Sequence, residues 1–220
     1  SDIRPDALDA LAERVVAMAR AAAEDPWCGL PDPALLSTRR DELSLYDSSA
    51  PTAEDLETRA RLCEEAALAV PGVTNSAGAG ADWGATRYSY AASNGFRGAQ
   101  NGSSFGVGIA VLAEANDQKE RDYDSDGARW QSDLKAADAV GRRAGERTIE
   151  KLGGRKIDSQ TAPVIFENRV AARLLGAFSG AISGGAIARG VSFLRDALGT
   201  PVFAPGISIV DDPFRVKGWG

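Results

Sequence analysis

The feature that most constrains the fold is residues 73–123, where the sequence pattern repeats every two residues. Thr86–Ala91 alternates between polar and apolar side chains, as a half-buried strand does. Asn94-Gly95 follows, and this dipeptide strongly favours a tight turn between two antiparallel strands. The stretch therefore predicts antiparallel pairing of neighbouring strands.

The remaining strands of this region follow the same alternation. Val107, Ile109 and Val111 fall on one face of a strand, and Ala113 extends that face, so one side of the sheet is expected to be buried. The predicted segments are a strand at Phe96–Gln100, a strand at Phe105–Ala113, a turn at Glu114–Asp117 and a strand at Gln118–Tyr123.

Outside this region the apolar residues recur at helical spacing, with short strands near the end of the chain. Thr52 and Asp55 form a capping box at the start of one helix, and Ser132 or Asp133 is expected to cap the next. The predicted class is α+β: an antiparallel β-meander packed with amphipathic helices, followed by the start of a second α/β domain. The predicted helices are Asp6–Glu24, Thr52–Ala69, Asp133–Leu152, Arg169–Gly180 and Ile187–Leu198, and the late strands are Ala162–Phe166 and Thr200–Val210.

The composition excludes several kinds of catalytic site. The chain has no histidine and only two cysteines, Cys28 and Cys63. Histidine is the usual general base near neutral pH, and zinc sites are built mainly from His and Cys. A self-contained zinc enzyme or a Ser-His-Asp hydrolase is therefore not expected. Cys63 lies on the apolar side of its helix and is predicted to be a small buried hydrophobe.

The charge balance bears on partners and location. A net charge of −6 and a pI of about 4.9 disfavour direct binding to nucleic acid or to an anionic membrane, because both need a basic face. No signal peptide or long apolar run is present in the sequence, so a cytoplasmic location is expected. Both ends look cut, which suggests a piece of a longer polypeptide.

An ordered set of motifs gives a resemblance. The chain is similar to the TldD/PmbA family, specifically its PmbA (TldE) branch, whose members are also called modulators of DNA gyrase. The resemblance implies three parts: 1–37 as the end of an N-terminal domain, 38–158 as the middle domain, and 159–220 as the beginning of a C-terminal domain. The motifs are Glu120–Tyr123, Ser132–Leu134, Val140-Gly141, Arg147-Thr148, Ala162–Phe166, Gly180–Gly185, Ser192–Leu194 and Leu198-Gly199.

The resemblance also implies which chemistry is missing. TldD-like members bind a metal through an H-E-x-x-x-H helix and a later Cys. On this chain the histidine positions fall at Gly176 and Ala181, and the catalytic Glu position falls at Ala177. None of these side chains can bind a metal or move a proton, so no catalytic and no metal-binding residue is expected here.

The implied function is that of the non-metal subunit in a TldD/TldE-type peptidase. A TldD-like partner would supply a divalent metal, with zinc expected, and the heterodimer would cleave unfolded peptides in the cytoplasm. This chain would close the chamber and hold substrate. The candidate residues for a peptide groove or interface are Gly180, Ser183, Gly184, Gly185 and Arg189.

Alternatives stay open at this stage. The glycine run is also compatible with close helix packing, and it lacks the Lys-Ser/Thr ending of a phosphate-binding loop. The chain could instead be a stand-alone peptide-binding or regulatory adaptor, an enzyme whose site lies outside this fragment, or a homodimer.

Two further groups of residues have competing interpretations. The alternating acids favour a solvated strand face over a calcium site, because the EF-hand spacing is missing. The aromatic residues favour core or sheet-face positions, with a peptide-binding surface as the alternative. The acids are Glu120, Asp122, Asp124 and Asp126, and the aromatics are Tyr88, Tyr90, Phe96 and Phe105.

Overall fold

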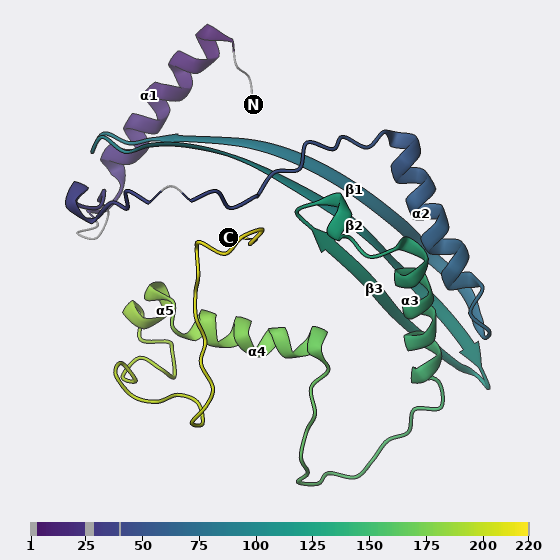
Figure 1. Ribbon diagram of the computed structural model, residues 1–220. Helices are drawn as coiled ribbons and strands as arrows, with labels where there is room; N and C mark the ends of the chain where they lie inside the picture. Colours follow the sequence, from purple (N-terminus) through teal and green to yellow (C-terminus); the bar gives the residue numbers. More distant parts are fainter. Residues whose placement is uncertain (1–3, 25–28, 40, 220) are drawn as a thin grey trace.

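The computed structural model describes residues 4–24, 29–39 and 41–219 (Figure 1). Helices combine with one three-stranded antiparallel sheet, so the predicted α+β class is confirmed. Cys28 lies outside the described residues. The elements are α1 (Pro5–Ala21), a 3-10 turn η1 (Pro33–Leu35), α2 (Ala53–Leu68), β1 (Val73–Ala91), β2 (Arg97–Ala115), β3 (Gln118–Ala128), a 3-10 turn η2 (Gln131–Asp133), α3 (Ala137–Lys151), α4 (Asn168–Ala181) and α5 (Gly184–Ala188).

The sheet is a meander in the order β1-β2-β3, and β1 and β2 form a long curved hairpin (Figure 1). Residues 97–115 form one strand, where the sequence predicted two, because β1 pairs with β2 along the whole length. Residues between Gln100 and Phe105 therefore keep their hydrogen bonds and do not interrupt the strand. β3 pairs only with Phe105–Ala115.

Both predicted turns are confirmed. Gly95 has a φ of +92°, and the backbone N–H of Ala92 donates to the carbonyl of Phe96 at 3.0 Å. In the second turn Asn116 and Asp117 have φ values of 48° and 62°. Two successive left-handed residues match the natural twist of a tight hairpin, and Asn and Asp tolerate this conformation better than most residues do.

The capping box at the start of α2 is confirmed. The Thr52 hydroxyl accepts from the backbone N–H of Asp55 at 3.2 Å, and the Asp55 carboxylate accepts from the backbone N–H of Thr52 at 2.8 Å. The same helix buries Cys63 completely, as predicted. Burial raises the pKa of the Cys63 thiol to about 11, and the nearby Asp124 and Glu64 add to the effect, so the thiol stays protonated at neutral pH.

Helix α3 begins at Ala137, four residues later than predicted. Gln131–Asp133 forms a 3-10 turn instead, because the backbone N–H of Gln131 is held by the Asp47 carboxylate at 2.9 Å. The Asp133 carboxylate accepts from Lys217 Nζ at 2.5 Å and does not cap the helix. The expected capping role of Ser132 or Asp133 is therefore wrong.

The core lies between the sheet and the α2–α3 layer. Apart from Phe105, its members are small or β-branched, and the predicted buried face of β2 is confirmed. A methyl group on Gly141 would stand 1.9 Å from the carbonyl oxygen of Cys63, and one on Gly145 would stand 2.7 Å from Val70 Cγ2. The two helix backbones therefore approach too closely for any side chain at Gly141. The core residues are Cys63, Ala67, Phe105, Val107, Ile109, Val111, Ala113, Val140 and Ala144.

In the segment that was expected to open a second domain, the predicted helix Arg169–Gly180 forms as α4, but the two predicted strands do not form. Within the described residues no strand follows β3, and the segments predicted as strands, Ala162–Phe166 and Thr200–Val210, are irregular. Ile165 is 97% exposed. A strand needs a neighbouring strand to pair its backbone groups, and within the described residues neither stretch pairs with one. The predicted helix Ile187–Leu198 is reduced to α5, and Gly190, with a φ of +68°, follows its end.

The helix crossing yields a first prediction. Gly141→Ala should lower the free energy of unfolding by about 2 kcal/mol or more, because the added methyl group forces the α2 and α3 backbones apart. Gly176→Ala is the matched control, since this helical glycine has no atom within 4 Å of the new methyl group. It should be neutral or stabilising by about 0.5–1 kcal/mol. Urea unfolding of both variants measures the difference, and equal effects would contradict the close crossing.

Candidate functional site

Helix α4 carries the positions where the sequence resemblance predicts the metal-binding motif to fall. Gly176 and Ala177 are exposed, and Ala181 is 8% exposed at the end of the helix. The helix contains no carboxylate, thiol or imidazole, so it offers no ligand for a metal and no base for water. Across the described ranges, no group of three or more His, Cys, Asp or Glu side chains could hold a metal ion.

The five predicted groove residues lie together where α4 meets α5. Gly180 belongs to the last turn of α4, and Arg189 follows α5 directly. Ser183 has a local structural role, because its hydroxyl accepts from the backbone N–H of Ala186 at 3.3 Å and caps α5. Gly184 and Gly185 form the first turn of α5. A bound peptide at this elbow stays a prediction.

The interpretation of this glycine run as a helix-packing surface is wrong for the described chain. A methyl group at Gly176, Gly180 or Gly184 would meet no atom within 4 Å, so no backbone approaches there. The large apolar residues of α4 are also largely uncovered, and Leu174 is 53% exposed. Phe178 is the exception, because its ring contacts Phe203 edge to face at 5.1 Å.

An ion pair joins α4 to the sheet. Arg169, in the first turn of α4, donates from Nη1 and Nη2 to the two carboxylate oxygens of Asp122 at 2.9 and 2.8 Å. Lys151 Nζ reaches the same carboxylate at 3.0 Å. Arg147 makes a second link between the sheet and α4, because it pairs with Asp124 of β3 and with Glu167, the residue before α4. Charged contacts therefore set where α4 begins.

This arrangement corrects the interpretation of the acidic row as a solvated strand face. Asp122 is 4% exposed, and Asp124 and Asp126 are paired with Arg147 and Lys135. The acids are spaced by two residues along β3, so they share the face that α3 covers. Their partners come from α3, from the segment before it and from α4, and sequence spacing alone does not reveal that match.

The electrostatics of Asp122 follow from two opposing effects. Burial alone would raise the pKa of the carboxyl, because it removes water from the charged form. Hydrogen bonds from Arg169, from the backbone N–H of Tyr123 and from Lys151 outweigh burial and hold the pKa well below its usual range. The same pair raises the pKa of the Arg169 guanidinium, so both groups are charged at neutral pH.

Two clefts flank the sheet domain. One, of about 680 Å³, gathers Tyr88, Tyr90 and Phe96 from the hairpin with Tyr46 and Phe214 from distant segments. Tyr88 is 60% exposed, whereas Phe105, the fourth aromatic of the sequence prediction, is buried in the core. Tyr88, Tyr90 and the half-buried Phe96 therefore line a cleft that could hold a peptide, and the sequence pattern did not predict this cleft.

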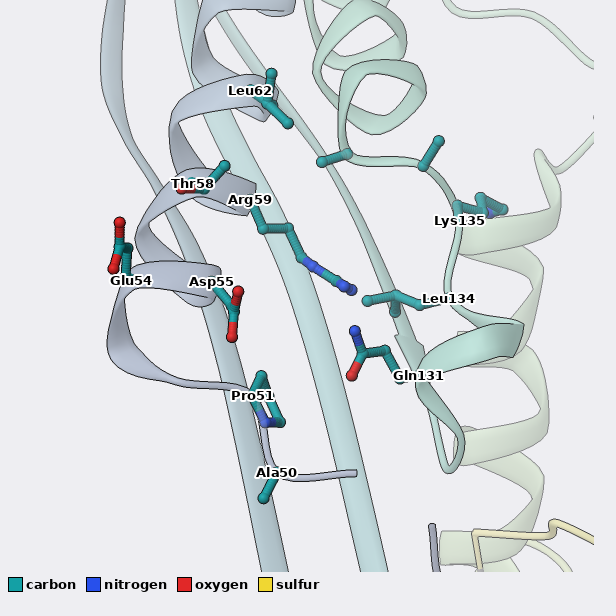
Figure 2. Close-up of a pocket in the computed structure, with 12 residues that line it drawn as sticks. Ala50, Pro51, Glu54, Asp55, Thr58, Arg59, Leu62, Gln131, Leu134 and Lys135 are labelled. Atoms are coloured by element: carbon teal, nitrogen blue, oxygen red, sulfur yellow. The ribbon is translucent and has the colours of Figure 1, made fainter. Parts of the chain in front are cut away.

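The other cleft, of about 670 Å³, lies between the first turns of α2 and the segment that leads into α3 (Figure 2). Arg59 and Gln131 extend into it from opposite sides, and Leu62 and Leu134 line its walls. Sequence reasoning missed this cleft. The capping box fixed the start of α2, but nothing in the sequence indicated that α3 begins late and leaves a gap beside it.

Comparison with known proteins gives a consistent picture. The sequence pattern described as the PmbA/TldA metallopeptidase central domain matches residues 46–152, and the pattern of the C-terminal domain matches residues 159–220. The chain is 31% identical over 219 residues to Metalloprotease PmbA of Escherichia coli O157:H7, covering 99% of this chain and 49% of that protein. A Metalloprotease PmbA homolog from Haemophilus influenzae is 29% identical over 218 residues, covering 99% and 48%. The chain spans about half the length of the curated relatives it matches.

Solved structures share the fold. A proposed modulator of DNA gyrase from Bacteroides thetaiotaomicron superposes with a TM-score of 0.79 at 22% identity, covering 87% of this chain and 45% of that chain. TldE from Thermococcus kodakarensis superposes with a TM-score of 0.62 at 18% identity, covering 88% and 43%. In the part of the chain that the structure describes, every helix is too short or too polar to cross a membrane.

The ion pair yields a second prediction. Because the pKa of Asp122 lies below its ordinary value of about 3.9, the pairing stabilises the fold above that pH and is lost as the pH falls toward the folded pKa. Asp122→Asn should lower the unfolding free energy by about 2 kcal/mol at pH 7 and flatten its decline below about pH 5.

Urea unfolding between pH 7 and pH 3 measures this effect. Glu65→Gln is the control, because Glu65 and Arg61 form an exposed pair with 58% of each side chain accessible. Exposed pairs contribute little, so this variant should change stability by less than about 0.5 kcal/mol. A pH profile of Asp122→Asn that parallels the wild type would refute the assignment.

Proposed function

Since the chain belongs to the PmbA/TldD metallopeptidase family, with PmbA proteins among its relatives, we propose that it forms part of the non-metal-binding subunit of a two-component peptidase. In this proposal a TldD-like subunit supplies a divalent metal, zinc being expected, and the carboxylate that activates water. The complex works in the cytoplasm on unfolded peptides. The chain follows the family's division into parts at 1–37, 38–158 and 159–220.

One observation carries the proposal. The resemblance assigns the H-E-x-x-x-H motif of TldD-like members to α4, and α4 has Gly176, Ala177 and Ala181 at those positions and no His, Cys, Asp or Glu. Metal-assisted peptide hydrolysis needs imidazoles on one helix face and a carboxylate beside them. No histidine occurs anywhere in the 220 residues, so no neighbouring segment of this sequence can restore the imidazole ligands.

The exposure of α4 and α5 supports an interface role for this region. Val170, Leu174, Leu175 and Ile182 leave between 38% and 53% of their surfaces uncovered, and the glycines beside them leave the backbone open. Apolar surface of this kind is typical of protein contacts. Gly180, Ser183, Gly184, Gly185 and Arg189 would then line the contact with the TldD-like chain or with substrate backbone.

A second candidate function, a stand-alone peptide-binding adaptor, is favoured by the aromatic cleft. Tyr88, Tyr90 and Phe96 lie with Tyr46 and Phe214 around one concave surface, and aromatic side chains bind extended peptides without any catalytic group. This cleft would bind peptide whether or not a metal-bearing subunit is present.

A mixing experiment distinguishes the two candidates and is the third prediction. Cleavage of an unstructured peptide is measured with the full-length protein alone, with a TldD-like subunit, and with both in the presence of a chelator. Activity should appear only in the mixture and disappear on chelation. Changing the Glu of the partner's H-E-x-x-x-H motif to Gln should also abolish it, because that carboxylate activates water.

Two results would count against the subunit proposal. Metal-dependent cleavage by the full-length protein alone would place ligands elsewhere in its own chain. Peptide binding without any association with the TldD-like subunit would favour the adaptor.

A further inference from the structure

Arg59 differs from the other arginines of the described chain that are at least partly buried. Arg129, Arg143, Arg147 and Arg169 each donate to a carboxylate or a carbonyl oxygen. Within the described residues Arg59 is partly buried yet makes no hydrogen bond and no ion pair. A guanidinium carries five donors and is always charged, so one that faces a cleft without a protein acceptor can offer its donors to a ligand.

The acids closest in sequence make no hydrogen bond or ion pair with Arg59 in the described chain. Asp55 Oδ2 accepts from the backbone N–H and the hydroxyl of Thr52 at 2.8 and 2.7 Å, which holds the carboxylate at the helix cap. These hydrogen bonds are the main cause of the lowered pKa of Asp55, and the charge of Arg59 adds only a lesser effect. Glu54 also lines the cleft, but in the described chain no hydrogen bond or ion pair joins it to Arg59. The guanidinium therefore points into open space with its donors unused.

A second polar side chain faces the same space. Gln131 and Arg59 point toward each other across the cleft (Figure 2). The backbone N–H of Gln131 is fixed by Asp47, so the residue is well positioned, but in the described chain its side-chain amide has no hydrogen-bond partner. Leu62 and Leu134 add apolar walls. Convergent polar groups on apolar walls are typical of binding sites.

We propose that this cleft binds a carboxylate group of a polypeptide, with Arg59 as its anchor. A guanidinium and a carboxylate match in a planar pair with two parallel hydrogen bonds. The Gln131 amide can donate to a carboxylate oxygen and accept from a neighbouring peptide N–H. Leu134 and Leu62 would pack against the aliphatic part of the bound residue.

The charges around the cleft favour a carboxylate over a phosphate or a nucleic acid. Arg59 is the one cation available there, because Lys135 on the rim is paired with Asp126 at 3.0 Å. Asp55 and Glu54 lie close by, and the protein has a net charge of −6. One guanidinium balances the single charge of a carboxylate, whereas a doubly charged phosphate would keep an unbalanced charge that Asp55 and Glu54 repel.

Peptide binding to the full-length protein tests this proposal, our fourth prediction, independently of any metal-bearing partner. Fluorescence anisotropy compares three labelled unstructured peptides: one with a central Glu and an amidated end, the same peptide with Gln, and the Gln peptide with a free C-terminus. Wild-type protein should prefer a carboxylate-bearing peptide over the amidated Gln peptide by about tenfold. The two carboxylate peptides reveal whether a side chain or a chain end is bound.

Variants assign the preference to the cleft. Arg59→Met should abolish it, and Gln131→Leu should reduce it. Arg61→Met is the matched control, because it removes the same charge from the same helix at an exposed residue paired with Glu65. The preference is a ratio measured on one variant, so partial unfolding does not mimic its loss. Equal binding of all three peptides by wild type, or equal losses in Arg59→Met and Arg61→Met, would overturn the proposal.

Discussion

The contact on which the rest of the structure depends is the backbone crossing of α2 and α3. Gly141 lies so close to the Cys63 carbonyl that no side chain fits between them. This crossing makes the two helices a single layer that covers one face of β1–β3 with small and β-branched residues. Tight packing of small side chains supplies dispersion contacts. Helices held further apart by larger side chains would lose some of these contacts. Near the start of α2 the neighbouring segment is the one that precedes α3. There the charged side chain of Arg59 and the polar side chain of Gln131 face a cleft.

Charge pairing organises what lies outside that core. The acidic face of β3 meets cations from three segments, and Asp122 holds Arg169 across 47 residues of chain. The apolar surface of α4 remains largely uncovered, so its first turn is positioned by ion pairs more than by burial. This gives α4 two separate properties. Its beginning is fixed to the sheet, and its end, together with α5, presents an open surface of small and apolar residues.

Local signals predicted the local structure well. The Thr52 capping box, the Asn94-Gly95 turn and the alternating face of β2 each depend on residues close in sequence, and each is confirmed. The predictions failed where distant partners decide. Ala162–Phe166 has a strand-like composition, but a strand forms only beside another strand.

The same reason explains what was missed at the candidate sites. The close contact at Gly141 was not predicted, because a glycine in a helix carries no apolar signal that would place it against another backbone. The cleft of Arg59 and Gln131 depends on two segments 72 residues apart, and the sequence between them says nothing about their distance. The absence of histidine ligands could be predicted directly, because folding cannot supply a residue type that the sequence lacks.

The central claim is that this chain contributes structural elements, but no bound metal, to a peptidase complex. Elemental analysis of the purified complex between the full-length protein and a TldD-like subunit tests it most directly. The account predicts one metal ion for each pair of chains, retained by the TldD-like subunit after the two are separated. Metal that stays with the protein carrying this sequence, or two ions for each pair, would contradict it.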